Sequence, residues 1–232
     1  MFLTFITKYP FILAFLIGLV PALIWMWFWL KEDAHPEPAK MLTLSFLGGM
    51  IAVLFALPLQ KIVYFYFAEN QYLSFTLWAT IEEVLKFVFV YFIALRNKVT
   101  DEPVDNIIYL IVSALGFVTL ENALFLIQPI STGDIADTII NGNLRFIGAS
   151  LLHIMSSATI GISMGLSFYK SRTIKRMDVV FGIIMAIVLH TTFNLFIINQ
   201  VSGNIFFIFG MVWTGIIILL LLSEKVKHMN SS

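Results

Sequence analysis

The stretch LWATIEEVLKFVFVYF, residues 77–92, is apolar enough to lie in a lipid bilayer, yet it holds Glu82, Glu83 and Lys86 near its middle. A charged side chain at the bilayer centre costs at least about 2.5–3.5 kcal/mol, even on insertion scales. Three such groups on one helix would be prohibitive if they faced lipid. We therefore expect them to face one another, or a water-filled cavity, inside a bundle of membrane helices.

The composition of the whole chain agrees with this placement. Of its 232 residues, 59% are hydrophobic and 12% are charged, whereas an ordinary soluble domain is about 25% charged. We expect an all-α, polytopic membrane protein with a single transmembrane domain over residues 1–232. The formal net charge is zero, which argues against nucleic acid as a partner. The chain has no cysteine, so thiolate chemistry, disulfides and Cys-based zinc sites are excluded.

Apolar runs separated by short polar loops predict about seven membrane spans, since roughly twenty helical residues cross the hydrocarbon core. The first of them, after Lys8, lacks a cleavage site and is expected to be a retained helix rather than a signal peptide. The second could continue through the aromatic residues Tyr64 to Phe67 at the membrane interface. The predicted spans are residues 10–30, 41–60, 72–95, 106–128, 143–169, 179–199 and 205–222.

The basic residues give this topology an orientation. Seven spans place the loops 31–40, 96–105 and 170–178 on one side together with the C-terminal tail, and that side collects ten of the 14 lysines and arginines. The opposite side has Lys8 and Lys61, while Lys86 and Arg145 lie inside spans. Because cytoplasmic loops carry the excess of Lys and Arg, we expect the N-terminus outside and the C-terminus in the cytoplasm.

Further polar residues lie at comparable depths in other spans. With a rise of 1.5 Å per residue, Glu82 and His153 are each about 15 Å from the outer face. Four spans thus bring polar groups to the middle and outer half of the bilayer, and we expect them to converge on one site. Besides the charged residues of 77–92, the set is Glu121, Asn122, Arg145, His153, His190 and Asn194.

Spacing within the helices indicates which of these side chains can interact. Lys86 is three residues from Glu83 and four from Glu82, so either carboxylate can reach it on one helix face. Lys86 can thus neutralise one carboxylate and leave the other for chemistry. His190 and Asn194 are also four apart, so Asn194 could orient the imidazole or donate to a substrate carbonyl.

Each group also has a purely structural interpretation. The residues Glu82, Glu83 and Lys86 could form a buried structural ion pair. Asn122 could join helices by hydrogen bonding, and Arg145 could extend to the interface. A single histidine in a helix bundle is more often a satisfied core group than a ligand. Packing alone does not explain several costly groups at matched depth, and this favours a functional site.

Glutamates and histidines in a membrane cavity are suited to activating water. A glutamate could act as general base on water that attacks a peptide carbonyl, with a histidine or Asn194 stabilising the oxyanion. Alternatively, Glu121, His153 and His190 could hold a divalent metal such as zinc. The chain has no HExxH motif, so the familiar zinc-protease helix is absent.

Four blocks of this sequence resemble the PrsW family of intramembrane proteases. EEVLK at 82–86 is similar to that family's EExxK motif, and PVDNIIYLIVSALGFVTLEN at 103–122 resembles its second block. The second block includes Asp105, Gly116, Phe117, Glu121 and Asn122, but has Asn106 where the family usually has glycine. Arg145 with LLHIMSSATIG, and then LHTTFN at 189–194, resemble the third and fourth blocks.

The resemblance implies an intramembrane endopeptidase with a catalytic core over about residues 72–200, related to the CAAX prenyl endopeptidases and bacterial Abi proteins. It implies a multi-pass protein of a prokaryotic cell membrane, surrounded by lipid, that cleaves a membrane-anchored protein such as an anti-sigma factor. The expected catalytic residues are Glu82, Glu83, Lys86, Glu121, His153 and His190, supported by Asn122, Arg145, Asn194 and Asp105. A proton- or ion-coupled transporter and a non-catalytic scaffold are the alternatives.

Overall fold

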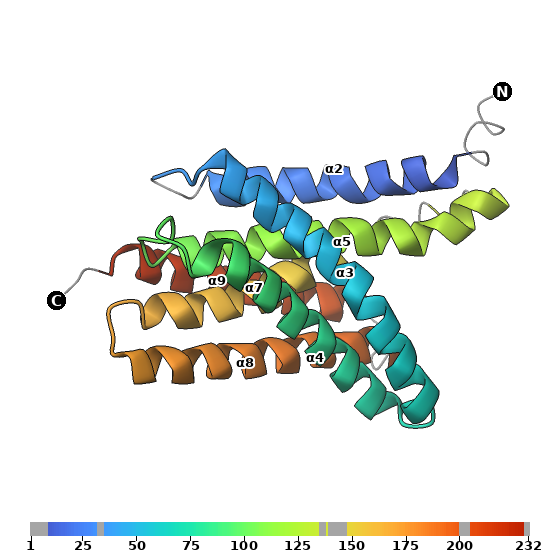
Figure 1. Ribbon diagram of the computed structural model, residues 1–232. Helices are drawn as coiled ribbons and strands as arrows, with labels where there is room; N and C mark the ends of the chain where they lie inside the picture. Colours follow the sequence, from blue (N-terminus) through green and yellow to red (C-terminus); the bar gives the residue numbers. More distant parts are fainter. Residues whose placement is uncertain (1–8, 32–34, 135–137, 139–147, 200–204, 230–232) are drawn as a thin grey trace.

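The structure, a computed structural model, describes residues 9–31, 35–134, 138, 148–199 and 205–229. Within these ranges it consists of helices joined by short loops, without strands (Figure 1), which confirms the predicted all-α class. The helices are α2 (Pro10–Leu30), α3 (Ala39–Phe67), α4 (Gln71–Val90), which continues into the π-helical turn η1 (Tyr91–Leu95), α5 (Asp105–Thr132), α7 (Ser150–Leu166), α8 (Arg172–Asn199) and α9 (Ile205–Lys227).

Local sequence accounts for several of the helix ends. Pro10 occupies the first position of α2, where its missing N–H is not needed. The side chain of Asn70 accepts a hydrogen bond of 3.1 Å from the backbone N–H of Leu73, which caps α4. Gly133 ends α5 with φ of 74°, a left-handed conformation that glycine adopts without strain.

Four of these helices, α2, α3, α5 and α8, are long and apolar enough to cross a membrane, and α7 is a shorter apolar helix. The predicted extension of the second span is confirmed, because α3 continues past Lys61 to Phe67. The predicted start of the fifth span at residue 143 lies outside the described residues. The count of seven spans and the orientation in the membrane remain predictions.

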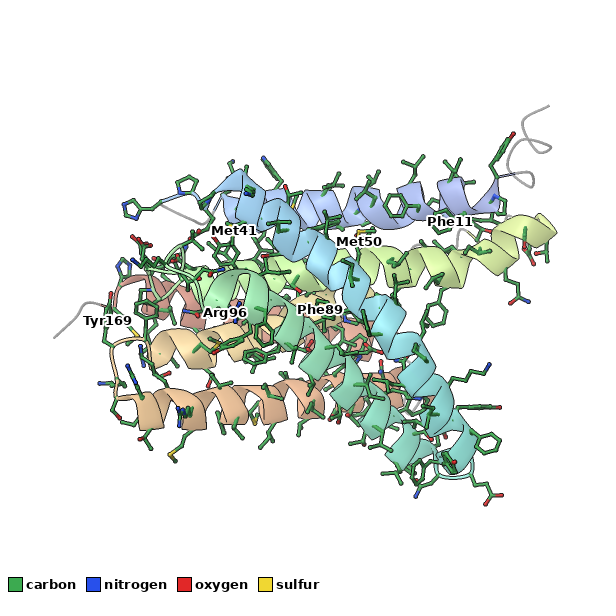
Figure 2. All side chains as sticks on the ribbon, in the orientation of Figure 1. Phe11, Met41, Met50, Phe89, Arg96 and Tyr169 are labelled. Atoms are coloured by element: carbon green, nitrogen blue, oxygen red, sulfur yellow. The ribbon has the colours of Figure 1, made fainter. Side chains whose placement is uncertain are left out.

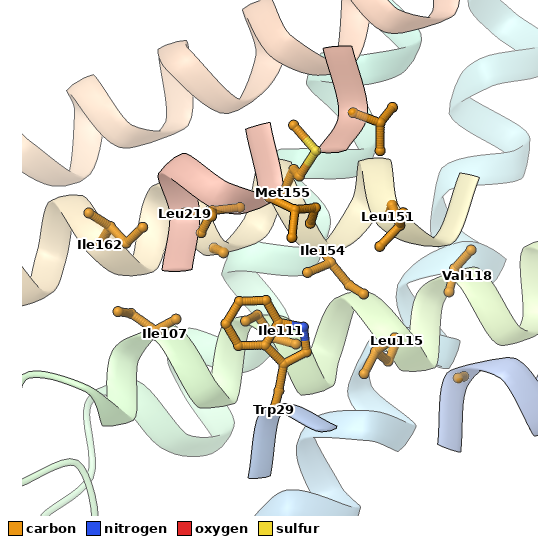
Figure 3. Packing of buried hydrophobic residues seen from close by; sticks show 14 of the residues in the cluster. Trp29, Ile107, Ile111, Leu115, Val118, Leu151, Ile154, Met155, Ile162 and Leu219 are labelled. Carbon is orange, nitrogen blue, oxygen red and sulfur yellow. The ribbon is translucent and has the colours of Figure 1, made fainter. Parts of the chain in front are cut away.

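Helix α5 forms the centre of the bundle. It packs against α2, α3 and α7, and most of its residues are buried, whereas much of α2 and α8 faces outward. The largest apolar cluster joins α2, α5, α7 and α9 (Figure 3), where Trp29, Ile111, Ile154 and Leu219 pack together. Burying one central helix in this way lets polar side chains on its neighbours meet away from lipid.

The helices α3 and α4 form a hairpin that runs diagonally across the other helices (Figure 1). Met50 of α3 and Phe89 of α4 lie near this crossing (Figure 2) and pack against the same small cluster, which includes Phe117. The side chain of Phe11 is half exposed on α2, as expected for a surface in contact with lipid. The diagonal crossing turns the charged face of α4 toward α5, α7 and α8.

Several loops that the basic residues predict to lie on one side of the membrane are found at one end of the bundle. Arg96 and Tyr169 both lie toward this end (Figure 2), where α9 also ends. This arrangement groups the loops as the positive-inside analysis does.

Two glycines allow α3 and α5 to cross closely. A Cβ atom added at Gly49 would meet the backbone oxygen of Ser113, and one added at Gly116 would meet the backbone oxygen of Phe46. Because the obstacles are backbone atoms, they cannot move aside as a flexible side chain can. Small residues at such crossings are the usual means of close helix packing in membranes.

We therefore expect Gly116→Val to lower the free energy of unfolding by roughly 1–3 kcal/mol, because overpacking must push α3 away from α5. Gly210→Val is the matched control, since a Cβ at Gly210 meets no atom within 4 Å. Thermal unfolding in detergent, followed by loss of the monodisperse peak, measures both variants. Equal midpoints for the two would contradict the close crossing.

Candidate active site

The structure brings six of the predicted site residues into one buried polar cluster. Glu82, Glu83 and Lys86 come from α4, Glu121 from α5, His153 from α7 and His190 from α8. Apart from Glu121, which is partly exposed, all of these side chains are at least nine-tenths buried. The predicted convergence of four spans is therefore present in the geometry.

Glu83 lies at the middle of the cluster and accepts hydrogen bonds from three helices. Its Oε1 accepts from Lys86 Nζ at 2.6 Å, from His190 Nδ1 at 2.7 Å and from Ser156 Oγ at 2.9 Å. Its Oε2 lies 3.5 Å from Ser157 Oγ. With its charge paired and its lone pairs in use, Glu83 is suited to fixing α4 against α7 and α8.

Lys86 is fully buried and has contacts in three directions. Besides Glu83, its Nζ donates to His153 Nδ1 at 3.1 Å. It also lies 5.3 Å from the centre of the Phe117 ring, within the range of a cation–π interaction. As the spacing along α4 predicts, Lys86 pairs with one carboxylate, Glu83, and leaves Glu82 for other contacts.

Glu82 differs from its neighbour because half of its carboxylate is unused. Its Oε1 accepts from Gln60 Nε2 at 2.7 Å, which fixes the orientation of the group. Its Oε2 is buried and has no hydrogen-bond partner among the described residues. His190 Nε2 lies 3.6 Å from this oxygen. A buried carboxylate oxygen without a partner is costly and is a place where water or a cation binds favourably.

The partners of His190 determine which of its nitrogens carries the proton. Glu83 is already paired with Lys86 and can only accept, so His190 Nδ1 donates to it. In neutral His190, Nε2 then presents a lone pair toward Glu82 Oε2. Two acceptors facing each other across 3.6 Å need a proton, a water molecule or a cation between them.

His153 has the opposite arrangement. The Lys86 ammonium has only protons to offer, so His153 Nδ1 accepts and its Nε2 carries the proton in the neutral ring. That Nε2 lies 3.2 Å from Glu121 Oε2 and donates to it. The rings of His153 and His190 lie edge to face with their centres 5.0 Å apart. In their neutral forms, Nε2 of His190 is therefore an acceptor, whereas Nε2 of His153 is a donor.

A metal ion is also compatible with part of this cluster. One ligand atom from each of Glu82, His153 and His190 lies within 4.8 Å of the others. A carboxylate with two imidazoles is a donor set that zinc accepts in catalytic sites. Glu82 and His190 each have an atom ready for an ion, whereas His153 would first have to release the proton that it shares with Glu121. Sequence reasoning chose Glu121 instead of Glu82 for this set, together with the two histidines.

The remaining predicted residues lie in different places. Asn122 is buried on α5, near Gly18 of α2, and Asn194 is partly buried one turn beyond His190. Asp105 accepts from the backbone N–H groups of residues 101 and 102 at 2.8 and 2.7 Å and so orders the start of α5. It is sixteen residues, or roughly 24 Å, from Glu121 along the helix. Arg145 lies outside the described residues.

Sequence reasoning missed three groups that hold the two carboxylates. Ser156 and Ser157 follow His153 by three and four residues, so helical spacing could have placed them on the side of the cluster. Gln60 had no such pattern, because it comes at the end of an apolar run and resembles the polar end of a span. Its backbone oxygen also accepts from the indole N–H of Trp78 at 3.1 Å, which ties it to α4.

Comparison with known proteins gives one consistent result. The model of the PrsW family intramembrane metalloproteases matches residues 37–222. A protein named Protease PrsW from Geobacillus kaustophilus is 32% identical over 63% of this chain and 60% of its own length. The relative of the same name from Clostridioides difficile is 26% identical over 94% of this chain and 92% of its own length. The one from Bacillus subtilis is 30% identical over 67% of each. No solved structure matches the chain.

The buried pair of Glu83 and Lys86 should dominate the stability of the cluster. We expect Lys86→Met to lower the free energy of unfolding by roughly 3–5 kcal/mol, because it leaves a buried carboxylate without its cation. Adding Glu83→Gln to that variant should restore a large part of the loss. Unfolding of the single and double variants in detergent gives the coupling between the two residues.

Lys227→Met is the control, since Lys227 and Glu224 are 3.2 Å apart at a partly exposed site. Breaking such a pair should cost less than about 1 kcal/mol. Equal stability of the Lys86→Met variant and the wild type would show that the pair does not hold the cluster together.

Proposed function

We propose that this chain, which belongs to the PrsW family of intramembrane proteases, hydrolyses peptide bonds of membrane-anchored protein substrates with Glu82 as its general base. The observation that supports this assignment is the buried Oε2 of Glu82, which has no hydrogen-bond partner among the described residues and faces His190 Nε2. A water molecule held there would have a carboxylate to receive its proton. Few other arrangements inside a membrane satisfy such an oxygen.

The reaction uses the two carboxylates differently. Water between Glu82 and His190 gives a proton to Glu82 Oε2 as its oxygen attacks the carbonyl carbon of the substrate. Glu82 then returns this proton to the amine that leaves when the C–N bond breaks. Glu83 keeps its bonds to Lys86, His190 and Ser156 throughout, and so holds His190 with Nε2 toward the water.

The other polar groups support this centre. His153 donates its Nε2 proton to Glu121 at 3.2 Å, and the same proton could turn to the developing oxyanion. Asn194 follows His190 by one helical turn, a position from which an amide can hold the substrate backbone. We assign Asn122 and Asp105 to positioning the helices, and Arg145 to pairing with a carboxylate.

A bound divalent ion would act at the same place. Glu82, His153 and His190 are the residues that would hold it, and the ion would supply Lewis-acid activation of water. In either case Glu82 keeps its orientation through Gln60 Nε2, which donates to its Oε1 at 2.7 Å. Gln60 is therefore a positioning residue for this reaction.

The substrate class follows from where the site lies. Two of the helices that supply the cluster, α5 and α8, are suited to crossing a membrane, so a peptide reaches it most readily when it is itself anchored in the bilayer. We propose a membrane-anchored regulatory protein, of which an anti-sigma factor in a stress response is one example.

We expect Glu82→Gln to retain the fold and to lower cleavage of a single-span model protein by about a hundredfold or more, because a general base contributes on the order of 10²–10⁴ in rate. Glu69→Gln is the matched control, since Glu69 is exposed between α3 and α4. Purified variants in liposomes, with fragments identified by mass spectrometry, give the rates. Wild-type turnover by Glu82→Gln would remove Glu82 from the mechanism, and proton flux without any cleavage would favour a transporter.

Metal content separates the two forms of the mechanism. If an ion is part of the site, elemental analysis of the purified protein should find about one zinc per chain, and both a chelator and His190→Ala should remove it. If Glu82 activates water without an ion, cleavage should continue in the presence of the chelator. Cleavage that is lost with the chelator and restored by zinc would contradict the metal-free form.

A further inference from the structure

A cavity of about 660 Å³ lies between α7, α8 and α9, outside the cluster of glutamates and histidines. Its volume is typical of ligand-binding pockets. Among the described residues the lining has no charged group, and its polar side chains are Thr192 and Thr214. The hydroxyl of Thr214 donates to the backbone oxygen of Gly210 at 2.7 Å and is thereby satisfied. The cavity is therefore suited to an apolar ligand.

The cavity lies at the same level of the bundle as the proposed catalytic residues. Leu152 and Leu189 line it and directly precede His153 and His190 in the chain. With a rise of 1.5 Å per residue, a residue and its neighbour differ little in depth. The two imidazole rings lie 5.0 Å apart between α7 and α8, so the cavity and the polar cluster share these two helices.

The described parts of the helices around the cavity do not all pack against one another. Helix α9 packs against α7, and α7 packs against α8, but the described parts of α8 and α9 have little contact with each other. Phe193 of α8 and Met211 of α9 face the cavity from its two sides. A substrate anchored by its own membrane helix has to approach sideways through the bilayer, between two helices of the bundle.

We propose that this cavity binds the apolar residues of the substrate's membrane-spanning segment next to the bond that is cleaved. The proposal rests on the protease function proposed above, and it names α8 and α9 as the side of entry. A helix from the substrate must unwind locally to expose a peptide bond, so its apolar side chains need a new apolar surface. The cavity supplies that surface, and Thr192 supplies a hydroxyl for one freed backbone group.

Gly210 provides a direct means of testing the cavity. It lines the cavity, and a Cβ atom there would meet no atom within 4 Å, so we expect a larger side chain at this position to reduce the space in the cavity. Gly215 lacks this property, because a Cβ there would meet the end of Met155. Ile217 is exposed on the same helix and does not line the cavity, so it is a suitable control position.

The experiment measures binding separately from cleavage. The full chain with Glu82→Gln is mixed in detergent with a single-span, leucine-rich peptide that contains a photoactivatable leucine, and cross-links are located by mass spectrometry. We expect labelling of Leu189 and Met211. Gly210→Phe should reduce it by about tenfold or more, as expected for a filled apolar pocket, whereas Ile217→Phe should leave it unchanged.

Every outcome bears on the proposal. Labelling that is unaffected by Gly210→Phe, or absent from the cavity, would overturn it. A phospholipid that co-purifies with the protein and is lost in Gly210→Phe, with peptide labelling unchanged, would assign the cavity to an acyl chain instead. Peptide bound in the cavity but never cut by the wild type would support the binding site and contradict the protease function. Cleavage that Gly210→Phe leaves unchanged would support the protease function and contradict the binding site.

Discussion

The contact between Lys86 and Glu83 is the interaction on which the rest of the site depends. A lysine with no exposed surface is tolerated only beside a partner, and Glu83 Oε1 lies 2.6 Å from its Nζ. Through Glu83 the pair fixes His190 of α8 and Ser156 of α7, and through Lys86 it fixes His153. A single buried ion pair thus aligns three helices. Removing one partner of such a pair costs more than the intact pair contributes to stability, because the other charge is left buried and unpaired.

The close crossing of α3 and α5 brings a further side chain, from α3, to this cluster. Gly49 and Gly116 let the two backbones touch, which brings the second half of α3 over α4. Gln60, eleven residues beyond Gly49, then reaches Glu82. Substitutions at the glycines would therefore act on the site through geometry, without touching any of its polar groups.

The two adjacent glutamates show how environment divides roles between identical residues. Glu83 accepts hydrogen bonds from four side chains, one of them the lysine that it neutralises. Glu82 is held by one amide and has one oxygen without a hydrogen-bond partner among the described residues. The first arrangement stabilises the bundle, and the second is costly unless something binds there. The apolar cavity is lined by Leu152 and Leu189, which directly precede His153 and His190 in the chain. The polar cluster and the cavity thus share helices α7 and α8.

The sequence alone was sufficient for the all-α class, for most helix positions and for the identity of the central polar residues, because charges in apolar helices have few acceptable environments. Helical spacing also predicted that Lys86 would pair with one glutamate. Which glutamate it pairs with, and the contributions of Gln60, Ser156 and Ser157, were decided by contacts between helices far apart in the chain. Spacing within one helix carries no information about the rotation of its neighbours. The cavity between α7, α8 and α9 likewise depends on how three helices pack, a property that no single segment encodes.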